Sequence, residues 1–254
     1  MPPLLANNVI ATSACYRHWQ FAIYCVMDIE ELKRQAGEKA VEFVQPGMVI
    51  GLGTGSTAVH AVRKIGRLWQ AGKLPGIFCI PTSEATAREA EKFGLPLTSL
   101  NEQPLVGITI DGADEIAPDF DLIKGLGGAL LREKIVAAAS RRMVVVSDYR
   151  KEVPRLGARA PLPVEVIPFA QRPVTEYLQS LGAQVTLRMA GTRPFITDEQ
   201  NIILDCTFDG GISHPARLAQ AIRARPGVVE HGLFLGLATD VILAAPDGVV
   251  WRQK

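Results

Sequence analysis

Acidic and basic side chains that could move a proton gather between Asp111 and Glu133. Asp111 and Asp114 follow one apolar run, and a lysine-glycine turn at residues 124–128 follows another and precedes the segment that carries Glu133. A carboxylate held beside a lysine and a glycine-rich turn provides what proton abstraction next to a carbonyl requires, namely a base and positive charge for the developing oxyanion. This stretch is therefore the candidate for acid–base chemistry.

Each part of the stretch also has a simpler interpretation. Asp-Gly is a common turn dipeptide, and Glu133 between Arg132 and Lys134 fits a solvated helix face. The carboxylates of Asp111 and Asp114 could alternatively bind Mg²⁺, although a nearby lysine makes a second cation less necessary. The combination favours chemistry more than any single residue does.

A glycine-rich loop at residues 51–57, Gly-Leu-Gly-Thr-Gly-Ser-Thr, lies between a predicted strand and a predicted helix. Unpaired backbone N–H groups and the helix dipole favour an anion at such a place, and Thr54, Ser56 and Thr57 add hydroxyl donors. The loop is neither a Walker A loop nor a complete G-x-G-x-x-G fingerprint. It predicts a phosphate or carboxylate site, with a tight turn and capping residues as the alternative.

Apolar runs and amphipathic segments alternate along the first half of the chain. Predicted strands at 48–53, 77–80, 106–110, 122–123 and 143–146 alternate with predicted helices that begin near residues 28, 56, 83 and 128. The main strands are apolar throughout rather than at every second residue, which is typical of a parallel sheet covered on both faces. The expected fold class is α/β, with a doubly wound, mostly parallel sheet.

The second half has a different order of elements. A strand within 161–168, a helix at 174–181, strands at 184–189 and 201–206, a helix at 215–223 and a strand at 228–235 make the βαββαβ order of a ferredoxin-like unit. We expect a Rossmann-like catalytic domain of residues 28–157 plus 233–254, to which the strand-like tail returns. Residues 158–232 would form a second, smaller ferredoxin-like α+β domain.

The composition limits the classes of binding partner and the cellular compartment that can be expected. Lys and Arg number 27 against 26 Asp and Glu, so no net field favours nucleic acid or a membrane, and a small partner is expected. Four dispersed cysteines without C-x-x-C spacing and four dispersed histidines argue against a metal or redox site and favour a reducing compartment. Residues 1–27 make a poor signal or transit peptide, and we expect an extension that is disordered or not native, with Met27 as the natural start.

Four motifs in order make the sequence similar to a known family. GLGTGSTA, DGADEI, KGLGGALLREKI and PLPVEVIP follow one another from residue 51 to residue 168, and the chain from about Glu31 onward resembles ribose-5-phosphate isomerases of the A type. The resemblance implies interconversion of D-ribose 5-phosphate and D-ribulose 5-phosphate in the non-oxidative pentose phosphate pathway. It also implies no cofactor or metal, a cytoplasmic location, and a homodimer or homotetramer.

Carried over position by position, the resemblance implies roles for individual residues. Glu133 would move the proton between C1 and C2, Asp111 would assist ring opening, and Lys124 would stabilise the oxyanion. Substrate contacts are implied for Thr54, Gly55, Ser56, Thr57, Asp111, Gly112, Ala113, Asp114, Lys124, Gly125, Leu126, Gly127, Lys151 and Lys33.

One residue departs from the family pattern. Leu126 stands where the family usually has glycine, and its side chain could restrict φ or crowd the substrate. Two other functions stay open: an isomerase or deaminase of an amino-sugar phosphate, which would need a histidine near the motifs, and a catalytically silent sugar-phosphate sensor. Retention of Glu133 with Asp111, Asp114 and Lys124 favours turnover over the sensor.

Overall fold

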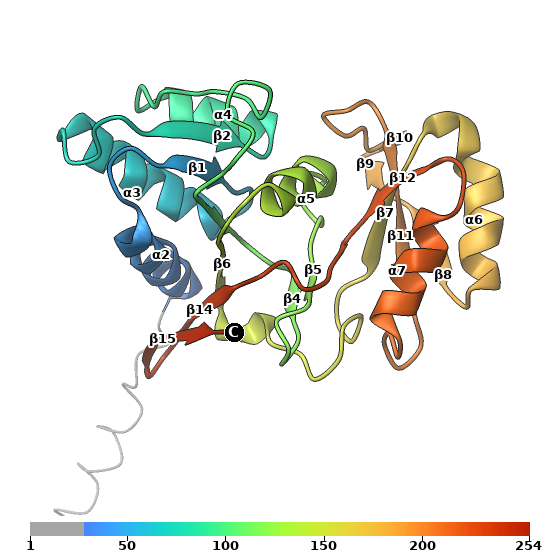
Figure 1. The fold of residues 1–254 in the computed structure, drawn as a ribbon. Helices are drawn as coiled ribbons and strands as arrows, with labels where there is room; N and C mark the ends of the chain where they lie inside the picture. Colours follow the sequence, from blue (N-terminus) through green and yellow to red (C-terminus); the bar gives the residue numbers. More distant parts are fainter. Residues whose placement is uncertain (1–27) are drawn as a thin grey trace, which may run out of the picture.

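The computed structural model describes residues 28–254, and the expectation for residues 1–27 lies outside this range. A six-stranded sheet with the order β15-β14-β6-β3-β1-β2 forms the centre of the first part of the molecule (Figure 1). Neighbouring strands are parallel from β2 to β14, and β15 runs antiparallel to β14. The strands are β1 (Val49–Leu52), β2 (Phe78–Pro81), β3 (Ile108–Asp111), β6 (Met143–Asp148), β14 (Asp240–Ala245) and β15 (Gly248–Gln253).

Strand β6 shows why these strands are apolar throughout. Val144 and Val146 belong to one buried cluster together with Leu32 of helix α2. Met143 and Val145, whose side chains alternate with these, belong to another cluster on the opposite face. Both faces of the sheet are therefore covered, as a doubly wound α/β fold requires.

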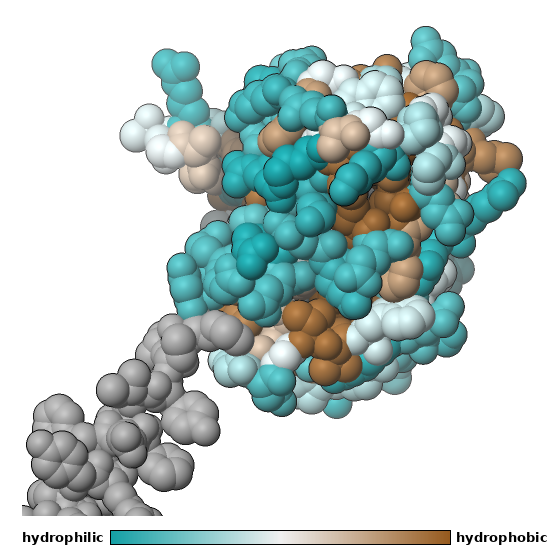
Figure 2. Space-filling view, turned by 90° about the vertical axis from the view of Figure 1, so that its left-hand side faces the viewer, coloured by the Kyte–Doolittle hydropathy of each residue, from teal (hydrophilic) through white to brown (hydrophobic). Residues whose placement is uncertain are grey.

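The helices of the first part follow their strands as predicted, with ends that differ by a few residues. They are α2 (Ile29–Ala40), α3 (Ala58–Gln70), α4 (Glu84–Glu91) and α5 (Leu130–Ala138), with short 3₁₀ turns η1 (Val41–Phe43) and η2 (Tyr149–Lys151). The face of the molecule formed by α2 and α3 is largely hydrophilic (Figure 2). This agrees with the burial of the apolar stripe of α3, which contains Ala61, Val62 and Ile65.

The N-terminal cap of α2 differs from the one that its sequence favours. Asp28 caps the helix, but its side chain accepts from the backbone N of Glu30 at 3.1 Å. Asp28 and Glu31 have the spacing of a capping box, in which Glu31 would turn back to the cap. Glu31 instead pairs with Arg34 at 2.6 Å, because an arginine three residues further along the helix is within reach of its carboxylate.

A second sheet has the order β12-β7-β11-β8, and each neighbouring pair is antiparallel. Its strands are β7 (Leu162–Val166), β8 (Gln184–Leu187), β11 (Ile202–Thr207) and β12 (Val228–His231), and the connecting helices are α6 (Gln171–Ser180), preceded by η3 (Pro168–Ala170), and α7 (Pro215–Arg223). In chain order these elements give βαββαβ, the ferredoxin-like arrangement. The expected fold class, an α/β domain with a smaller ferredoxin-like part, is confirmed.

Short strands link the two sheets. β4 (Glu115–Ile116), β5 (Leu122–Ile123) and β13 (Leu233–Phe234) form a three-stranded sheet, and β9 (Met189–Ala190) pairs with β10 (Arg193–Pro194). The strand predicted at 228–235 is thus divided between two sheets. Gly232 marks the division, because a Cβ there would lie 2.3 Å from the carbonyl oxygen of Lys124.

The tail returns to the first sheet as predicted, since β14 pairs with β6. The limits 28–157 plus 233–254 and 158–232 stay predictions. No helix among residues 28–254 combines the length and the apolar character needed to cross a membrane.

Candidate active site

A cavity of about 180 Å³ opens beside the carboxyl ends of the parallel strands. Gly53 follows β1, Asp111 ends β3 and Asp148 ends β6, so the segments after these strands meet at one edge of the sheet. The cavity is lined by Lys33, Thr54, Gly55, Ser56, Thr57, Gly112, Ala113, Asp114, Lys124, Gly125, Gly127, Glu133, Asp148, Arg150 and Lys151.

Three buried charged residues, which we call the acid–lysine cluster, lie together at this edge: Asp111, Lys124 and Glu133. Their exposed fractions are 0%, 2% and 4%. Lys124 Nζ lies 3.1 Å from Asp111 Oδ2 and 3.4 Å from Glu133 Oε2, and it donates to the carbonyl oxygen of Gly112 at 2.7 Å. Within residues 28–254 the ammonium group of Lys124 is the one polar partner of these two carboxylate oxygens. Buried carboxylate oxygens with so few donors are rare, and each can accept a further hydrogen bond.

Burial changes the proton affinity of all three side chains. Burial raises the pKa of Asp111, and the charge of Lys124 opposes the change. For Glu133, burial raises the pKa to about 8 against the opposing charge of Lys124, with Asp111 adding to the rise. Burial acts to lower the pKa of Lys124, but Asp111 and Glu133 together raise it to about 12. The cluster thus contains a fixed cation and a carboxyl group whose pKa is close to neutral pH, the range suited to a general base.

The glycine-rich loop wraps around the carboxylate of Asp111. Asp111 Oδ1 accepts from the backbone N of Thr54 at 3.0 Å and from that of Gly112 at 2.7 Å. A Cβ at Gly53 would lie 2.3 Å from the same oxygen, so this position requires glycine. Gly55 has φ +115°, a conformation that side chains disfavour. The loop sequence therefore serves the placement of Asp111 as well as the cavity.

The hydroxyl groups of the loop divide between two tasks. Thr54 Oγ1 lies 2.7 Å from Thr82 Oγ1, 2.8 Å from Ser83 Oγ and 3.1 Å from Thr86 Oγ1. It joins a buried hydroxyl network at the start of α4, which limits its availability as the phosphate donor that the sequence suggested. Ser56 and Thr57 line the cavity without such a network.

The turn after Lys124 places its glycines, but not Leu126, at the cavity. Gly125 and Gly127 line it, while the side chain of Leu126 is 40% exposed and is absent from the lining. The backbone N of Leu126 donates to Asp114 Oδ2 at 2.9 Å. The side chain of Leu126, the residue that departs from the family pattern, therefore lies outside the cavity lining, and only its backbone helps to hold Asp114.

The residues expected from the sequence line this one cavity, except Leu126 and the fully buried Asp111, which are absent from the lining. Lys33, from α2, reaches it although its Nζ also pairs with Glu30 at 2.7 Å. Sequence reasoning missed Asp148 and Arg150, which also line the cavity. Asp148 Oδ1 accepts from Arg150 Nε at 2.7 Å. The signal was present, because Asp148 ends an apolar strand of the parallel sheet in the same way as Asp111, but the predicted strand stopped at residue 146.

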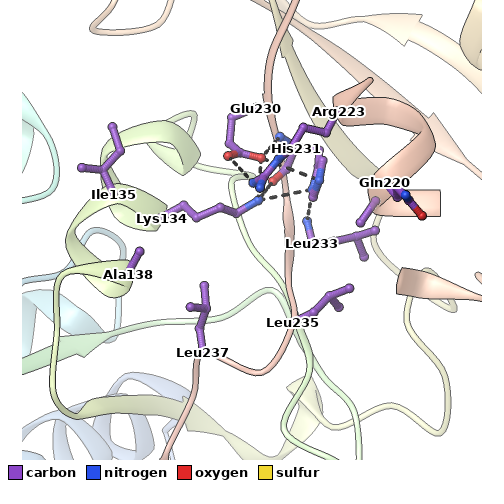
Figure 3. Close-up of a pocket in the computed structure, with 11 residues that line it drawn as sticks. Lys134, Ile135, Ala138, Gln220, Arg223, Glu230, His231, Leu233, Leu235 and Leu237 are labelled. Atoms are coloured by element: carbon purple, nitrogen blue, oxygen red, sulfur yellow. Dashed lines mark hydrogen bonds and ion pairs between the residues drawn. The ribbon is translucent and has the colours of Figure 1, made fainter. Parts of the chain in front are cut away.

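A larger cavity of about 520 Å³ lies between α5, α7 and β12, away from the strand ends (Figure 3). Leu235, Leu237 and Ile135 line part of it. Lys134, next to the acid–lysine cluster in sequence, donates here to Glu230 Oε1 at 2.8 Å and to the carbonyl oxygen of His231. Size alone would select this cavity, but its charged groups are already paired with one another.

Possible metal ligands are dispersed in the described part of the chain. Within residues 28–254 no group of three or more His, Cys, Asp or Glu side chains is placed to hold a metal ion. The cavity lining contains no histidine among these residues. Cys79 and Cys206 are buried and unpaired, and burial raises the pKa of each thiol to about 12. Cys15, Cys25 and His18 lie outside the described residues.

The fold and the cavity together define an α/β protein equipped for general acid–base catalysis. A glycine-rich loop, several cations and a buried carboxyl group surround one polar cavity. Comparison with known proteins identifies the family. The family model for ribose 5-phosphate isomerase A (phosphoriboisomerase A) matches residues 78–248, and the chain belongs to this family.

Relatives and solved structures match over most of their length. Ribose-5-phosphate isomerase A of Roseiflexus castenholzii is 50% identical over 225 residues, covering 88% of this chain and 96% of the relative. That of Gloeobacter violaceus is 52% identical over 224 residues, with the same two coverages. A D-ribose-5-phosphate isomerase solved in complex with phospho-erythronic acid is 36% identical with a TM-score of 0.87, covering 90% of this chain and all of that one. The Plasmodium falciparum ribose 5-phosphate isomerase is 38% identical with a TM-score of 0.86, covering 89% and 99%.

Proposed function

We propose that the acid–lysine cluster performs the proton transfer by which this enzyme interconverts D-ribose 5-phosphate and D-ribulose 5-phosphate. The activity follows from the family. The assignment of its steps to Glu133, Lys124 and Asp111 is our proposal. The observation that carries it is the placement of Lys124 Nζ between two buried carboxylates, 3.1 Å from Asp111 Oδ2 and 3.4 Å from Glu133 Oε2.

Glu133 is the base in the proposed reaction. It takes the proton from C2 of the open-chain aldose, the electrons of the C–H bond form the C1–C2 double bond, and the carbonyl electrons move to O1. Return of the proton to C1, with transfer of the O2 hydroxyl proton to O1, re-forms the carbonyl group at C2 and completes the ketose. The raised pKa of Glu133 supports this role, because a base gains proton affinity as its pKa rises toward the working pH.

Lys124 and Asp111 support the charge that develops on oxygen. Lys124, whose pKa is raised to about 12, remains a cation throughout and faces the enediolate oxygens. Asp111 assists ring opening and the movement of protons among the oxygens. The backbone N–H groups of Thr54 and Gly112 hold one oxygen of its carboxylate, and the other oxygen lies 3.1 Å from Lys124 Nζ.

The phosphate and the sugar hydroxyls occupy the remaining lining. The hydroxyl groups of Ser56 and Thr57 and the cations Lys33, Arg150 and Lys151 suit a dianionic phosphate. Asp114, Gly125 and Gly127 hold the sugar, with Asp114 accepting its hydroxyls. The complex of a solved relative with phospho-erythronic acid supports a phosphorylated sugar-like ligand here.

The test compares the wild-type protein with Glu133→Gln. The wild type should interconvert the two pentose phosphates, and EDTA should leave the rate unchanged because the chain itself supplies the base and the cation. Glu133→Gln should lower kcat by about 10²- to 10⁴-fold. Equilibrium binding of a phosphorylated sugar acid, measured by calorimetry, should stay close to the wild-type value because glutamine keeps the shape. Full activity in Glu133→Gln would reassign the base.

We also propose that the enzyme works in the cytoplasm as a homodimer or a homotetramer. The proposal rests on the resemblance of the motifs to the family and on the reducing compartment that the dispersed cysteines favour. Size-exclusion chromatography with light scattering measures the mass of the particle directly. A monomer at micromolar concentration would overturn the assembly.

A further inference from the structure

Arg188, at the end of the second sheet, reaches across to the turn that follows Lys124. It lies between β8 and β9, and its Nη1 donates to the carbonyl oxygens of Gly125 at 2.8 Å and Leu126 at 3.0 Å. Asp205 of β11 holds the guanidinium group from the other side, accepting from Nε at 2.9 Å and from Nη2. The Arg188 side chain is only 12% exposed, and its contacts with Gly125 and Asp205 are partly buried.

The same turn is held on its N–H side by a residue of the cavity. Leu126 N donates to Asp114 Oδ2 at 2.9 Å, while Arg188 binds the carbonyl of the same residue. Asp114, Gly125 and Gly127 line the cavity. The turn therefore connects the guanidinium group of Arg188, at the end of the second sheet, with the carboxylate of Asp114 at the cavity.

Packing adds to these contacts. The backbone N of Phe195 donates to the carbonyl oxygen of Arg188 at 2.9 Å. The Phe195 ring occupies the space next to Gly128, where an added Cβ would lie 2.4 Å from it. The segment between β8 and β11 thus contacts both ends of the turn, through Arg188 and Phe195. The turn lies between Lys124 and the helix that carries Glu133.

We propose that Arg188, held by Asp205, is a positioning residue for the isomerase reaction. It fixes the turn at residues 125–127 and through it Asp114 and the neighbouring backbone N–H groups. The expected effect of Arg188 on kcat rests on the proposed function. The hydrogen bonds between Arg188 and the turn do not depend on that function. Arg188 is placed in none of the catalytic steps above and acts through groups that touch the substrate.

The chemistry of the contact requires arginine. A planar guanidinium group can donate to two carbonyl oxygens and bind a carboxylate at the same time, in fixed directions. A lysine at this position supplies one ammonium group, which cannot make both sets of contacts. Arg188→Lys should therefore keep the charge and lose most of the positioning, which separates geometry from simple electrostatics.

The kinetic test uses Arg188→Met and Arg188→Lys, with Arg172→Met as the matched control. Arg172 belongs to the same half of the molecule, is 90% exposed and pairs only with Glu176 in its own helix. Displacing groups around a reacting centre by about 1 Å can cost about 100-fold. We expect kcat of Arg188→Met to fall about 10- to 100-fold, with KM within about threefold of the wild-type value. Arg188→Lys should recover less than half of this loss in kcat on a logarithmic scale. Arg172→Met should have the kcat and KM of the wild type.

A second measurement does not depend on turnover. Hydrogen exchange of the Leu126 amide should become at least tenfold faster in Arg188→Met, while amides of helix α6 keep their wild-type rates. Asp205→Asn, which leaves Arg188 in place, should give a smaller change in the same direction. A lower melting temperature with unchanged kcat and unchanged exchange at Leu126 would overturn the proposal. If the wild type failed to isomerise ribose 5-phosphate, the proposed function would be lost, and the exchange comparison would still decide the role of Arg188 in holding the turn.

Discussion

Two buried lysines, Lys124 and Lys134, approach the same Phe234 ring from different cavities. Their Nζ atoms lie 5.4 Å and 4.8 Å from its centroid, and their exposed fractions are 2% and 7%. Both are paired with carboxylates, and both belong to the segment that begins at the lysine-glycine turn. Burial, charge and sequence position are therefore alike for the two residues.

Hydrogen bonding separates them. Glu230, the partner of Lys134, accepts from Lys134 and from the backbone N of His231 on one oxygen and from Arg223 at 2.9 Å on the other (Figure 3). Around Lys124, by contrast, Asp111 Oδ2 and Glu133 Oε2 have, within residues 28–254, the ammonium group alone as a polar partner, at 3.1 Å and 3.4 Å. A carboxylate with every oxygen bonded to several donors is held in one arrangement, while a carboxylate oxygen with few donors can accept a further hydrogen bond.

The two lysines also differ in proton affinity. Two carboxylates outweigh burial at Lys124 and raise its pKa to about 12. At Lys134 burial outweighs the single carboxylate of Glu230 and lowers the pKa to about 8. The number of neighbouring carboxylates, rather than the depth of burial, decides which lysine stays charged across the physiological range.

The largest effect is expected from Lys124→Met. Loss of the oxyanion partner should lower kcat by about 10²- to 10³-fold, the usual cost of removing one stabilising group at a developing negative charge. Steady-state kinetics measures it. An activity within tenfold of the wild type would show that the comparison assigns the wrong lysine to catalysis.

The pH profile should show the raised pKa of Glu133. The carboxylate form is the base, so a pKa raised by burial moves the acidic limb of kcat/KM upward, to a midpoint near the value of about 8. Activity should fall about tenfold for each pH unit below that midpoint. A limb centred near the ordinary value of 4.5 for a glutamate would contradict the role of burial.

Lys134→Met should separate stability from activity. We expect kcat within about twofold of the wild type and a free energy of unfolding lower by about 1–3 kcal/mol, less than the ~3–5 kcal/mol typical of a broken buried pair because Arg223 still faces Glu230. Urea unfolding at neutral pH measures this change. Lys92→Met, which removes an exposed ion pair with Glu89, is the control and should change little. A large loss of kcat in Lys134→Met would show that Lys134, like Lys124, takes part in catalysis.

The smallest effect is expected at Leu126. Its side chain lies outside the cavity lining, so Leu126→Gly should change kcat and KM by about twofold or less, as usual for an exposed position. A marked gain in activity would show that the leucine crowds the substrate after all.

The sequence predicted most of the fold from local patterns. Apolar runs such as Met143 to Val146 indicated strands covered on both faces, and the βαββαβ order indicated the ferredoxin-like part. It failed at Gly232, where one predicted strand divides between two sheets. That division depends on contact with the carbonyl oxygen of Lys124, more than a hundred residues earlier in the chain, and no local pattern contains such information.

The candidate site shows the same boundary between local and distant information. Residue types and spacing were enough to select Asp111, Lys124 and Glu133, because a base and a cation near glycine-rich turns are chemically recognisable in sequence. Asp148 was missed, and the hydroxyl of Thr54 proved to be bound by residues of α4. Both depend on which segments follow neighbouring strands of the folded sheet.

The sequence by itself determined which groups could react, since chemistry belongs to residue types and the family motifs are continuous segments. Only the tertiary structure decided that Lys124 is held between two buried carboxylates, that Lys134 is paired elsewhere, and that Arg188 reaches the turn from the end of the second sheet. The physical reason is that burial and hydrogen-bond satisfaction are properties of packing between segments distant in the chain, and they set the pKa and the availability of every group in the site.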